Sequence, residues 1–179
     1  MPEIVMSEQE ITAILKDLAD CLMEGIKTWN DVVFIGIRSG GVLVARSIVK
    51  ILEQKTDMQI PLGTLDIALY RDDVSKRLFS PEVRSTDIPF SVDNKRVILV
   101  DDVINTGRSV RAAIDHILDF GRPKRIYFMV LFDRGGRELP IQPDFVGKEM
   151  SIPEEKIIKI EVAPDGIGIK DVIISGVKK

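Results

Sequence analysis

The stretch Val97–Ser109, with the sequence VILVDDVINTGRS, places two acids, a glycine and two hydroxyl side chains directly after an apolar run. The apolar run predicts a strand buried on both faces, and an open α/β sheet binds its ligand at the carboxyl ends of such strands. Thr106 and Ser109 stand at the start of a predicted helix, where free N–H groups bind anions such as phosphate. Asp101 and Asp102 are good acceptors for hydroxyl groups. The stretch therefore predicts a ligand with both a phosphate and a diol, such as a ribose phosphate.

Three other interpretations of this stretch are an ordinary turn, a receiver domain and a Walker-type nucleotide site. An ordinary strand-to-helix turn has no need for an acid pair, a glycine and hydroxyls together. A receiver domain also places two acids after an apolar strand, but there the acids follow the first strand, whereas a long stretch precedes them here. A Walker-type nucleotide site needs the pattern G-x-x-x-x-G-K-[ST], which this sequence lacks. The ribose phosphate site is therefore the favoured interpretation.

A second glycine turn strengthens this interpretation. It follows an apolar run at 31–37, precedes a predicted helix, and consists of Arg38, Ser39, Gly40 and Gly41. Glycines at such a turn are usually a matter of backbone geometry, but two anion loops at one sheet edge could hold a ligand with phosphate at both ends. Farther on, the polar stretch from Tyr70 to about Ser91 has little periodicity, which suggests a functional lid or a hairpin with Arg71 as its candidate side chain.

The elements that must position these turns alternate along the chain. The predicted helices cover Ser7 to about Gly25, Val42–Glu53 and Ser109–Phe120. The predicted strands cover residues 31–37, 63–69, the run that begins at Val97, 125–132 and three short segments at 144–146, 157–162 and 172–175. This order predicts an α/β fold in which helices flank a central, mainly parallel sheet and the short C-terminal strands form a small β hood.

The composition is that of an ordinary globular protein. The chain has 179 residues, 45% hydrophobic and 30% charged, with a net charge of −3, so we expect one domain over residues 1–179 and no general attraction to nucleic acid. The first ten residues contain acids and no long apolar core, and no run is long enough to cross a membrane. We therefore expect a cytoplasmic protein without membrane contact. Cys21, the only cysteine, excludes an internal disulfide, and its predicted helix makes it a candidate core residue.

Four segments resemble a known family. They are LDIALYRDDVSK (65–76), VILVDDVINTGRSVRA (97–112), GRPKRI (121–126) and LFDRGGRELPIQPDFVGKEM (131–150). The second resembles the phosphoribosyl pyrophosphate (PRPP) signature of the type I phosphoribosyltransferases. Together they are similar to the pyrimidine-operon regulators that are also uracil phosphoribosyltransferases, most closely from about Ile35 to Met150. RELPI followed by VGK is the most discriminating part of the match.

The resemblance implies a fold, a reaction and partners. The fold would be that of the type I phosphoribosyltransferases. Uracil would displace pyrophosphate from PRPP to give UMP, with Mg²⁺ held mainly by substrate phosphates and water and with no dedicated metal ligands on the protein. The expected partners are PRPP, uracil, and UMP or UTP, with pyrimidine-operon mRNA as a further candidate. The chain would form a homodimer or a larger homo-oligomer.

The resemblance also implies a role for each matching residue. Asp101 and Asp102 would hold the ribose diol, and Arg71 would belong to a loop that closes over the site, so these three are the candidate catalytic residues. Arg134 and Val146 would line the base pocket. The residues implied to bind PRPP or nucleotide are Arg38, Ser39, Gly40, Gly41, Asp101, Asp102, Val103, Ile104, Asn105, Thr106, Gly107, Arg108 and Ser109. No side chain is identified as a base for uracil.

The sequence departs from the family pattern at several positions. The second glycine turn, RSGG at 38–41, usually reads close to KTRG in the family; Asn105 replaces an aromatic residue, and Gly136 replaces a histidine. In the first helix, Lys16, Asp17 and Asp20 replace threonine, arginine and histidine associated with RNA binding, and two acids would repel RNA phosphate. Two alternatives therefore stay open. One is an attenuation regulator that senses uridine nucleotides and binds mRNA with little catalysis, and the other is a phosphoribosyltransferase for a different nucleobase.

Overall fold

The main sheet of the computed structural model, which describes residues 3–68, 70, 86–153, 155–163 and 168–175, is parallel throughout. Within these residues it has five strands in the order β3-β2-β4-β5-β6. The strands are β2 (Val32–Ile37), β3 (Leu62–Leu65), β4 (Arg96–Ile104), β5 (Arg125–Asp133) and β6 (Phe145–Glu149). The predicted mainly parallel sheet is confirmed, although β3 ends four residues before the predicted 63–69 strand does.

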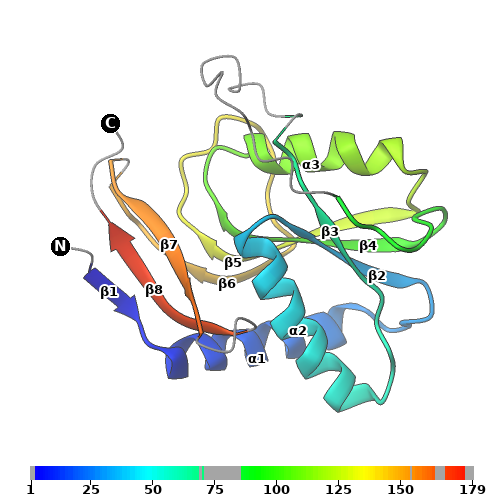
Figure 1. Cartoon of the computed structure of the whole chain (residues 1–179), viewed down its shortest axis with the longest axis horizontal. Helices are drawn as coiled ribbons and strands as arrows, with labels where there is room; N and C mark the ends of the chain where they lie inside the picture. The colour runs from blue at the N-terminus through cyan, green and yellow to red at the C-terminus, as the bar shows by residue number, and fades with distance from the viewer. Residues whose placement is uncertain (1–2, 69, 71–85, 154, 164–167, 176–179) are drawn as a thin grey trace.

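Helices cover both faces of this sheet, as Figure 1 shows. α1 (Glu8–Gly25) and α2 (Gly40–Thr56) lie on one face, and α3 (Arg108–Asp119) lies on the other. At the start of α1, the backbone N–H and the hydroxyl of Ser7 both donate to the Glu10 carboxylate, at 2.9 and 2.8 Å, as the sequence pattern predicts. The three predicted helices are confirmed within a few residues at each end.

The apolar runs of β2 and β4 serve two cores at once. Phe34 and Ile98 belong to the core cluster under α1 and α2, whereas Ile35 and Leu99, one residue farther along each strand, belong to the cluster under α3. All four side chains are fully buried. This alternation explains why these strands are continuously apolar, since both faces of a parallel sheet covered by helices exclude water. The rigid double core holds the carboxyl ends of β2 and β4 in place.

A second, antiparallel sheet has the order β1-β8-β7 and corresponds to the predicted hood. It contains β1 (Glu3–Met6), β7 (Ile157–Val162) and β8 (Ile169–Ser175). The set of strands in this sheet differs from the prediction in two ways. The segment predicted at 144–146 lies in the main sheet, where Val146 pairs with Val130, and the unpredicted β1 takes a place beside β8. Segments of four or five residues are too short to show a reliable period, so their partners were not visible in the sequence.

Three further expectations concern Cys21, the lid residue Arg71 and membrane contact. Cys21 is exposed and is not a core residue, because the buried stripe of α1 passes through Leu15, Leu18, Ala19 and Leu22 and leaves Cys21 on the outer face. Arg71, with most of the predicted lid or hairpin, lies outside the described residues. In the ranges given above, no helix combines the length and apolar character that a membrane crossing requires.

Candidate active site

The two predicted acids lie at the carboxyl end of the central strand β4. Asp101 is 8% exposed and Asp102 is half-buried. One carboxylate oxygen of Asp101 accepts the Asp102 backbone N–H at 2.9 Å, and one of Asp102 accepts the Val103 N–H at 2.9 Å. Local hydrogen bonds therefore orient both carboxylates beside the strand end, where an open parallel sheet binds ligands.

Both acids border a cavity of about 310 Å³. Arg38, at the end of β2, and Ser109, in the first turn of α3, border the same cavity. The Arg38 side chain is exposed and donates to the Thr64 hydroxyl at 3.4 Å. The remaining lining residues are Ile37, Asp66, Ile67, Ala68 and Val103. One cation, three carboxylates (Asp66, Asp101 and Asp102) and a hydroxyl thus surround a single space, which offers partners for both the hydroxyls and the phosphates of a ligand.

A smaller cavity of about 70 Å³ adjoins this space and shares Asp101, Val103 and Ser109 with it. Its other lining residues are Ile104, Asn105, Thr106, Gly107, Val110 and Phe128. Gly107 has a φ of 90°, in the left-handed region that favours glycine, and it is the N-cap of α3. The N–H groups of the first helical turn lack partners within the helix, so this loop is suited to an anion.

We call residues 104–109, which precede and begin α3, the phosphate-type loop. Residues 134–139 donate hydrogen bonds to the carbonyl groups of this loop. Ile104 O accepts a backbone N–H from it at 3.2 Å, and Thr106 O accepts two, at 2.9 and 3.0 Å. Asn105 O accepts the Arg137 guanidinium at 3.0 Å. Carbonyl oxygens repel anions, and here three successive ones are engaged by a neighbouring segment. The loop is therefore arranged to offer N–H groups to a ligand.

Arg137 is a residue that sequence reasoning missed. Its side chain is 14% exposed and ion-paired with Asp133. It also donates to the carbonyl oxygens of Asn105 and Ile141, both at 3.0 Å, and to Gln142 Oε1 at 3.2 Å. One guanidinium thus ties the phosphate-type loop to the turn after β5. The four-residue spacing of Asp133 and Arg137 was the available signal, but the resemblance directed attention to Arg134.

The predicted base-pocket residues lie in different surroundings. Arg134 borders a cavity of about 510 Å³ beside Asp133 and Arg137. Its guanidinium, however, donates to the carbonyl oxygens of Pro153 and Lys156, at 2.9 and 3.0 Å, so it anchors the chain before β7. Val146 is half-buried on β6 and packs against the core cluster under α3. The predicted set therefore does not converge on one space.

Two departures from the family pattern are neighbours in space. A Cβ atom at Gly136 would lie 2.6 Å from Asn105 Oδ1, closer than real Cβ contacts. The Asn105 carboxamide therefore fills the space that a side chain at position 136 would enter. A larger residue at 136 therefore requires a different residue or rotamer at 105.

The wall of the 310 Å³ cavity formed by residues 66–68 is anchored by α3. His116 Nδ1 lies 3.1 Å from Asp66 O, and because a carbonyl oxygen only accepts, Nδ1 carries the proton. Tyr70 stacks on the His116 ring at 4.1 Å and donates its hydroxyl to Asp119 at 2.5 Å. The only histidine of the chain is thus packed, and it supports the cavity wall without bordering the cavity.

Gly40 allows the second glycine turn, residues 38–41, to approach the Asp102 side chain. A Cβ atom at this position would overlap the carboxylate of Asp102 and lie 2.8 Å from Asp102 Cβ. We expect Gly40→Ala to displace this carboxylate and to raise the KM for the ribose phosphate ligand predicted above about tenfold, equivalent to about 1.4 kcal/mol. Steady-state kinetics with the concentration of this ligand varied measure the effect.

Gly25→Ala, at the end of α1, is the control for this substitution. The added methyl group would meet only the Phe145 ring, at 3.3 Å. An unchanged KM in Gly40→Ala, with a fold as stable as that of Gly25→Ala, would show that the Asp102 position is unimportant for substrate binding.

The pKa of Asp133 yields a prediction about stability in acid. Burial raises this pKa, but hydrogen bonds from the Arg137 side chain and the Gly135 N–H outweigh burial and hold it below its ordinary value of 3.8. A carboxyl whose pKa is lower in the folded state stabilises the fold above its unfolded pKa, and this contribution is lost as the pH falls through the folded pKa.

We therefore expect the difference in unfolding free energy between the wild type and Asp133→Asn to shrink from about pH 6 to about pH 3. Urea unfolding at each pH measures it. A difference that is constant over this range would contradict the lowered pKa.

Within the described part of the chain, no group of three or more His, Cys, Asp or Glu side chains is arranged to hold a metal ion. Asp101 and Asp102 are nevertheless two carboxylates at one cavity. Mg²⁺ at phosphate substrates is commonly bound by one or two carboxylates with water and substrate oxygens completing its shell. The residues present therefore fit a metal that arrives with a phosphorylated ligand.

The fold and this site define a phosphoribosyltransferase. The phosphoribosyl transferase domain family matches residues 5–165, and the chain belongs to this family. The chain is 41% identical over 158 residues to the bifunctional protein PyrR of Thermus aquaticus, covering 88% of this chain and 87% of that protein. It is 48% identical over 142 residues to the bifunctional protein pyrR of Enterococcus faecalis strain OG1RF, covering 78% of this chain and 79% of that protein.

Solved structures show the same fold at low sequence identity. A hypoxanthine phosphoribosyltransferase of Trypanosoma cruzi superposes with a TM-score of 0.69 at 16% identity, covering 98% of this chain and 97% of that one. A hypoxanthine-guanine phosphoribosyltransferase of Bacillus anthracis superposes with a TM-score of 0.68 at 20% identity, covering 87% of this chain and 86% of that one. The predicted type I phosphoribosyltransferase fold is thus confirmed.

Proposed function

We propose that this chain transfers the 5-phosphoribosyl group of PRPP to uracil, with UMP and pyrophosphate as products. One observation carries the proposal: the acid pair, Arg38 and the phosphate-type loop border two adjoining cavities at one sheet edge. PRPP combines a diol with phosphate groups at both ends, so it matches this set of groups. The likeness to bifunctional PyrR proteins supports uracil as the acceptor.

Each part of PRPP has a counterpart in the site. The 5′-phosphate is assigned to the 70 Å³ cavity, beside the loop 105–109 and the first turn of α3. The ribose hydroxyls are assigned to Asp101 and Asp102. The pyrophosphate is assigned to the 310 Å³ cavity near Arg38, with the turn 38–41 beside it. This placement leaves the anomeric carbon between the two cavities, where a base can attack it.

The chain's groups favour the transition state of this displacement. The bond from C1 to pyrophosphate breaks as N1 of uracil forms its own bond to C1 and releases its proton to water, and the ribose passes through an oxocarbenium-like state. Negative charge grows on the departing pyrophosphate, which the Arg38 guanidinium stabilises. Mg²⁺, when bound with PRPP, supplies further neutralisation of the phosphate oxygens. The carboxylates hold the ribose by its hydroxyls and stabilise positive charge on the ring.

The base has a candidate position beside the phosphate-type loop. Asp133 and Arg137 border the 510 Å³ cavity, and Arg137 also contacts the loop carbonyl of Asn105. The cavity walls are mostly polar groups, which suit the carbonyl and N–H edges of a nucleobase. A nucleobase in this cavity would therefore contact the same segment that anchors the phosphate-type loop.

The decisive assay supplies PRPP and Mg²⁺ with each of five bases: uracil, hypoxanthine, guanine, adenine and orotate. We expect UMP formation to exceed transfer to the other bases by at least about 100-fold in kcat/KM, since one missing hydrogen bond in a polar pocket has effects of this size or more. Turnover with a purine and none with uracil would reassign the acceptor. Absence of turnover with every base would reject the transferase function itself.

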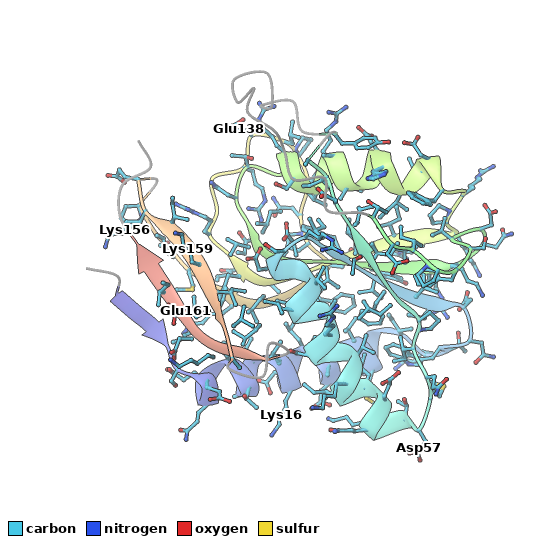
Figure 2. All side chains as sticks on the ribbon, viewed as in Figure 1. Lys16, Asp57, Glu138, Lys156, Lys159 and Glu161 are labelled. Carbon is cyan, nitrogen blue, oxygen red and sulfur yellow. The ribbon has the colours of Figure 1, made fainter. Side chains whose placement is uncertain are left out.

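The resemblance also implies binding of pyrimidine-operon mRNA. In place of the family's basic and hydroxyl residues, the exposed outer face of α1 carries Lys16, Asp17 and Asp20 (Lys16 is labelled in Figure 2), and Asp20 pairs with Lys55 of α2. The transferase site is therefore the better supported function. A gel shift with a pyrimidine-leader hairpin at low salt, with and without UMP, tests RNA binding, and no retardation in either case would reject it.

A further inference from the structure

A cavity of about 570 Å³ lies at the opposite edge of the main sheet from the candidate active site. It is bordered by Val32 and Val33, at the amino end of β2, and by Lys95, the residue before β4. The other lining residues are Trp29, Asn30, Met58, Gln59, Ile60, Pro61, Phe90 and Ser91. None of these residues has a part in the proposed transfer reaction. The volume lies within the range of roughly 300–1,000 Å³ that is typical of small-molecule sites.

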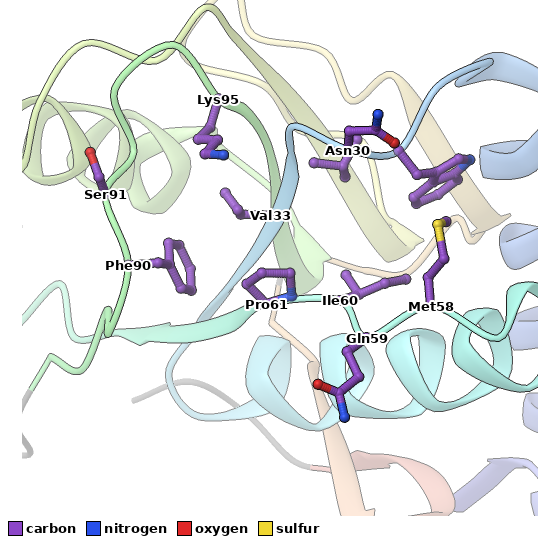
Figure 3. A pocket seen from close by; sticks show the side chains of 11 residues that line it. Asn30, Val33, Met58, Gln59, Ile60, Pro61, Phe90, Ser91 and Lys95 are labelled. Atoms are coloured by element: carbon purple, nitrogen blue, oxygen red, sulfur yellow. The ribbon is translucent and has the colours of Figure 1, made fainter.

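The walls of this cavity are mainly apolar and include two aromatic rings. Figure 3 shows Phe90, Pro61, Ile60 and Met58 in a row along one side, with Val33 beside them. Trp29 contributes the second aromatic ring. The flat faces of Phe90, Pro61 and Trp29 suit a planar ring better than a flexible chain, because stacked flat surfaces exclude water over their whole area.

Lys95 provides the one charge among the lining residues. Its backbone is held in a tight turn, where its N–H donates to Val92 O at 3.1 Å and its carbonyl accepts the Lys124 N–H at 2.8 Å. Figure 3 shows its side chain extending toward Val33, over the apolar row. Among the described residues, its ammonium group has no hydrogen bond or ion pair. The neighbouring Asp31 does not neutralise it, because that carboxylate is paired with Arg96.

We propose that this cavity is a second ligand site, for a planar aromatic compound that carries one negative charge. The rings and aliphatic side chains accept the flat body of the ligand, and Lys95 pairs with its anionic group. The proposal does not depend on the transferase function, because no lining residue is shared between the 570 Å³ cavity and the active-site cavities.

The single tryptophan of the chain makes the proposal directly testable, since Trp29 lines the cavity. The probe is 8-anilinonaphthalene-1-sulfonate, an aromatic monoanion with a planar naphthalene ring, and its neutral counterpart is N-phenyl-1-naphthylamine. We expect the sulfonate to bind the full chain at one site, to quench Trp29 emission and to remain bound when UMP is added. Lys95→Met should weaken sulfonate binding about fivefold, as for one exposed ion pair, and leave binding of the neutral compound unchanged.

Lys124→Met is the matched control, because Lys124 is a nearby lysine that does not line the cavity. Thermal unfolding of each variant shows that the fold is retained, and Trp29→Phe should abolish the tryptophan signal while the fluorescence of bound sulfonate persists. The proposal is overturned if the sulfonate leaves Trp29 emission unchanged, if UMP displaces it, or if Lys95→Met binds it as tightly as Lys124→Met does.

Discussion

Replacing either acid of the pair by its amide should lower kcat/KM for PRPP by about 10- to 100-fold, because each substitution removes a charged acceptor for a ribose hydroxyl, a loss of about 1.5–3 kcal/mol. Asp101→Asn and Asp102→Asn preserve shape and change only charge and hydrogen-bonding capacity. The carboxylates also stabilise positive charge on the ribose in the transition state, so kcat should fall together with a rise in KM. Steady-state kinetics with varied PRPP at saturating uracil measure both constants.

Asp57→Asn is the matched control for this pair. Asp57 caps the far end of α2 with a φ of 53°, a conformation that asparagine tolerates well. Figure 2 shows it at one extremity of the molecule, far from Glu138, which belongs to the segment beside the phosphate-type loop. Its kinetics should equal those of the wild type. Full activity in both Asp101→Asn and Asp102→Asn would contradict the role of the acids.

The second large effect is expected for Arg137→Met. This substitution removes the partner of Asp133, whose side chain is 15% exposed, and the donor to Asn105 O. Breaking a mostly buried charged pair should lower the free energy of unfolding by about 2–3 kcal/mol. Because the phosphate-type loop loses one of its anchors, the KM for PRPP should also rise. Urea unfolding and initial-rate kinetics measure the two effects.

Arg111→Met is the control for Arg137→Met. Arg111 lies on α3 and forms an exposed ion pair with Asp115 four residues along, with side chains about half exposed. Such pairs contribute at most about 1 kcal/mol, so this variant should resemble the wild type. Equal losses of stability in the two variants, or an Arg137→Met protein with unaltered KM, would mean that Arg137 does not position the loop.

The parts of the fold that the sequence predicts well are those with long periodic signals. The helix stripe of α1 and the apolar runs of β2 and β4 each reflect burial over many residues, and the structure confirms them. The strand β1 and the place of β6 were missed or misassigned. Both are short, and their pairing depends on segments far away in the chain, which no local pattern records.

In the candidate site, too, residues of a contiguous motif were predicted, whereas a residue whose role depends on distant contacts was missed. Asp101 and Ser109 were found because the signature is contiguous, and they share both active-site cavities. Arg137 was missed because its link to the phosphate-type loop is a hydrogen bond to Asn105 O, 32 residues earlier in the chain, which only folding brings within reach. Arg38 was identified at a turn that differs from the family pattern, and its position beside the acids depends on the parallel pairing of β2 and β4.

Comparison of UMP with 2′-deoxy-UMP tests the central claim most directly, because the two ligands differ only in one hydroxyl of the diol. Competition binding to the wild-type protein should show UMP bound about tenfold more tightly, as expected for one hydrogen bond to a charged acceptor. In at least one of Asp101→Asn and Asp102→Asn, the variant that removes the acceptor of the 2′-hydroxyl, this preference should shrink while binding of the deoxy compound changes little. Equal affinity of the wild-type protein for both nucleotides, or an undiminished preference in both variants, would contradict the assignment of the ribose to the acid pair.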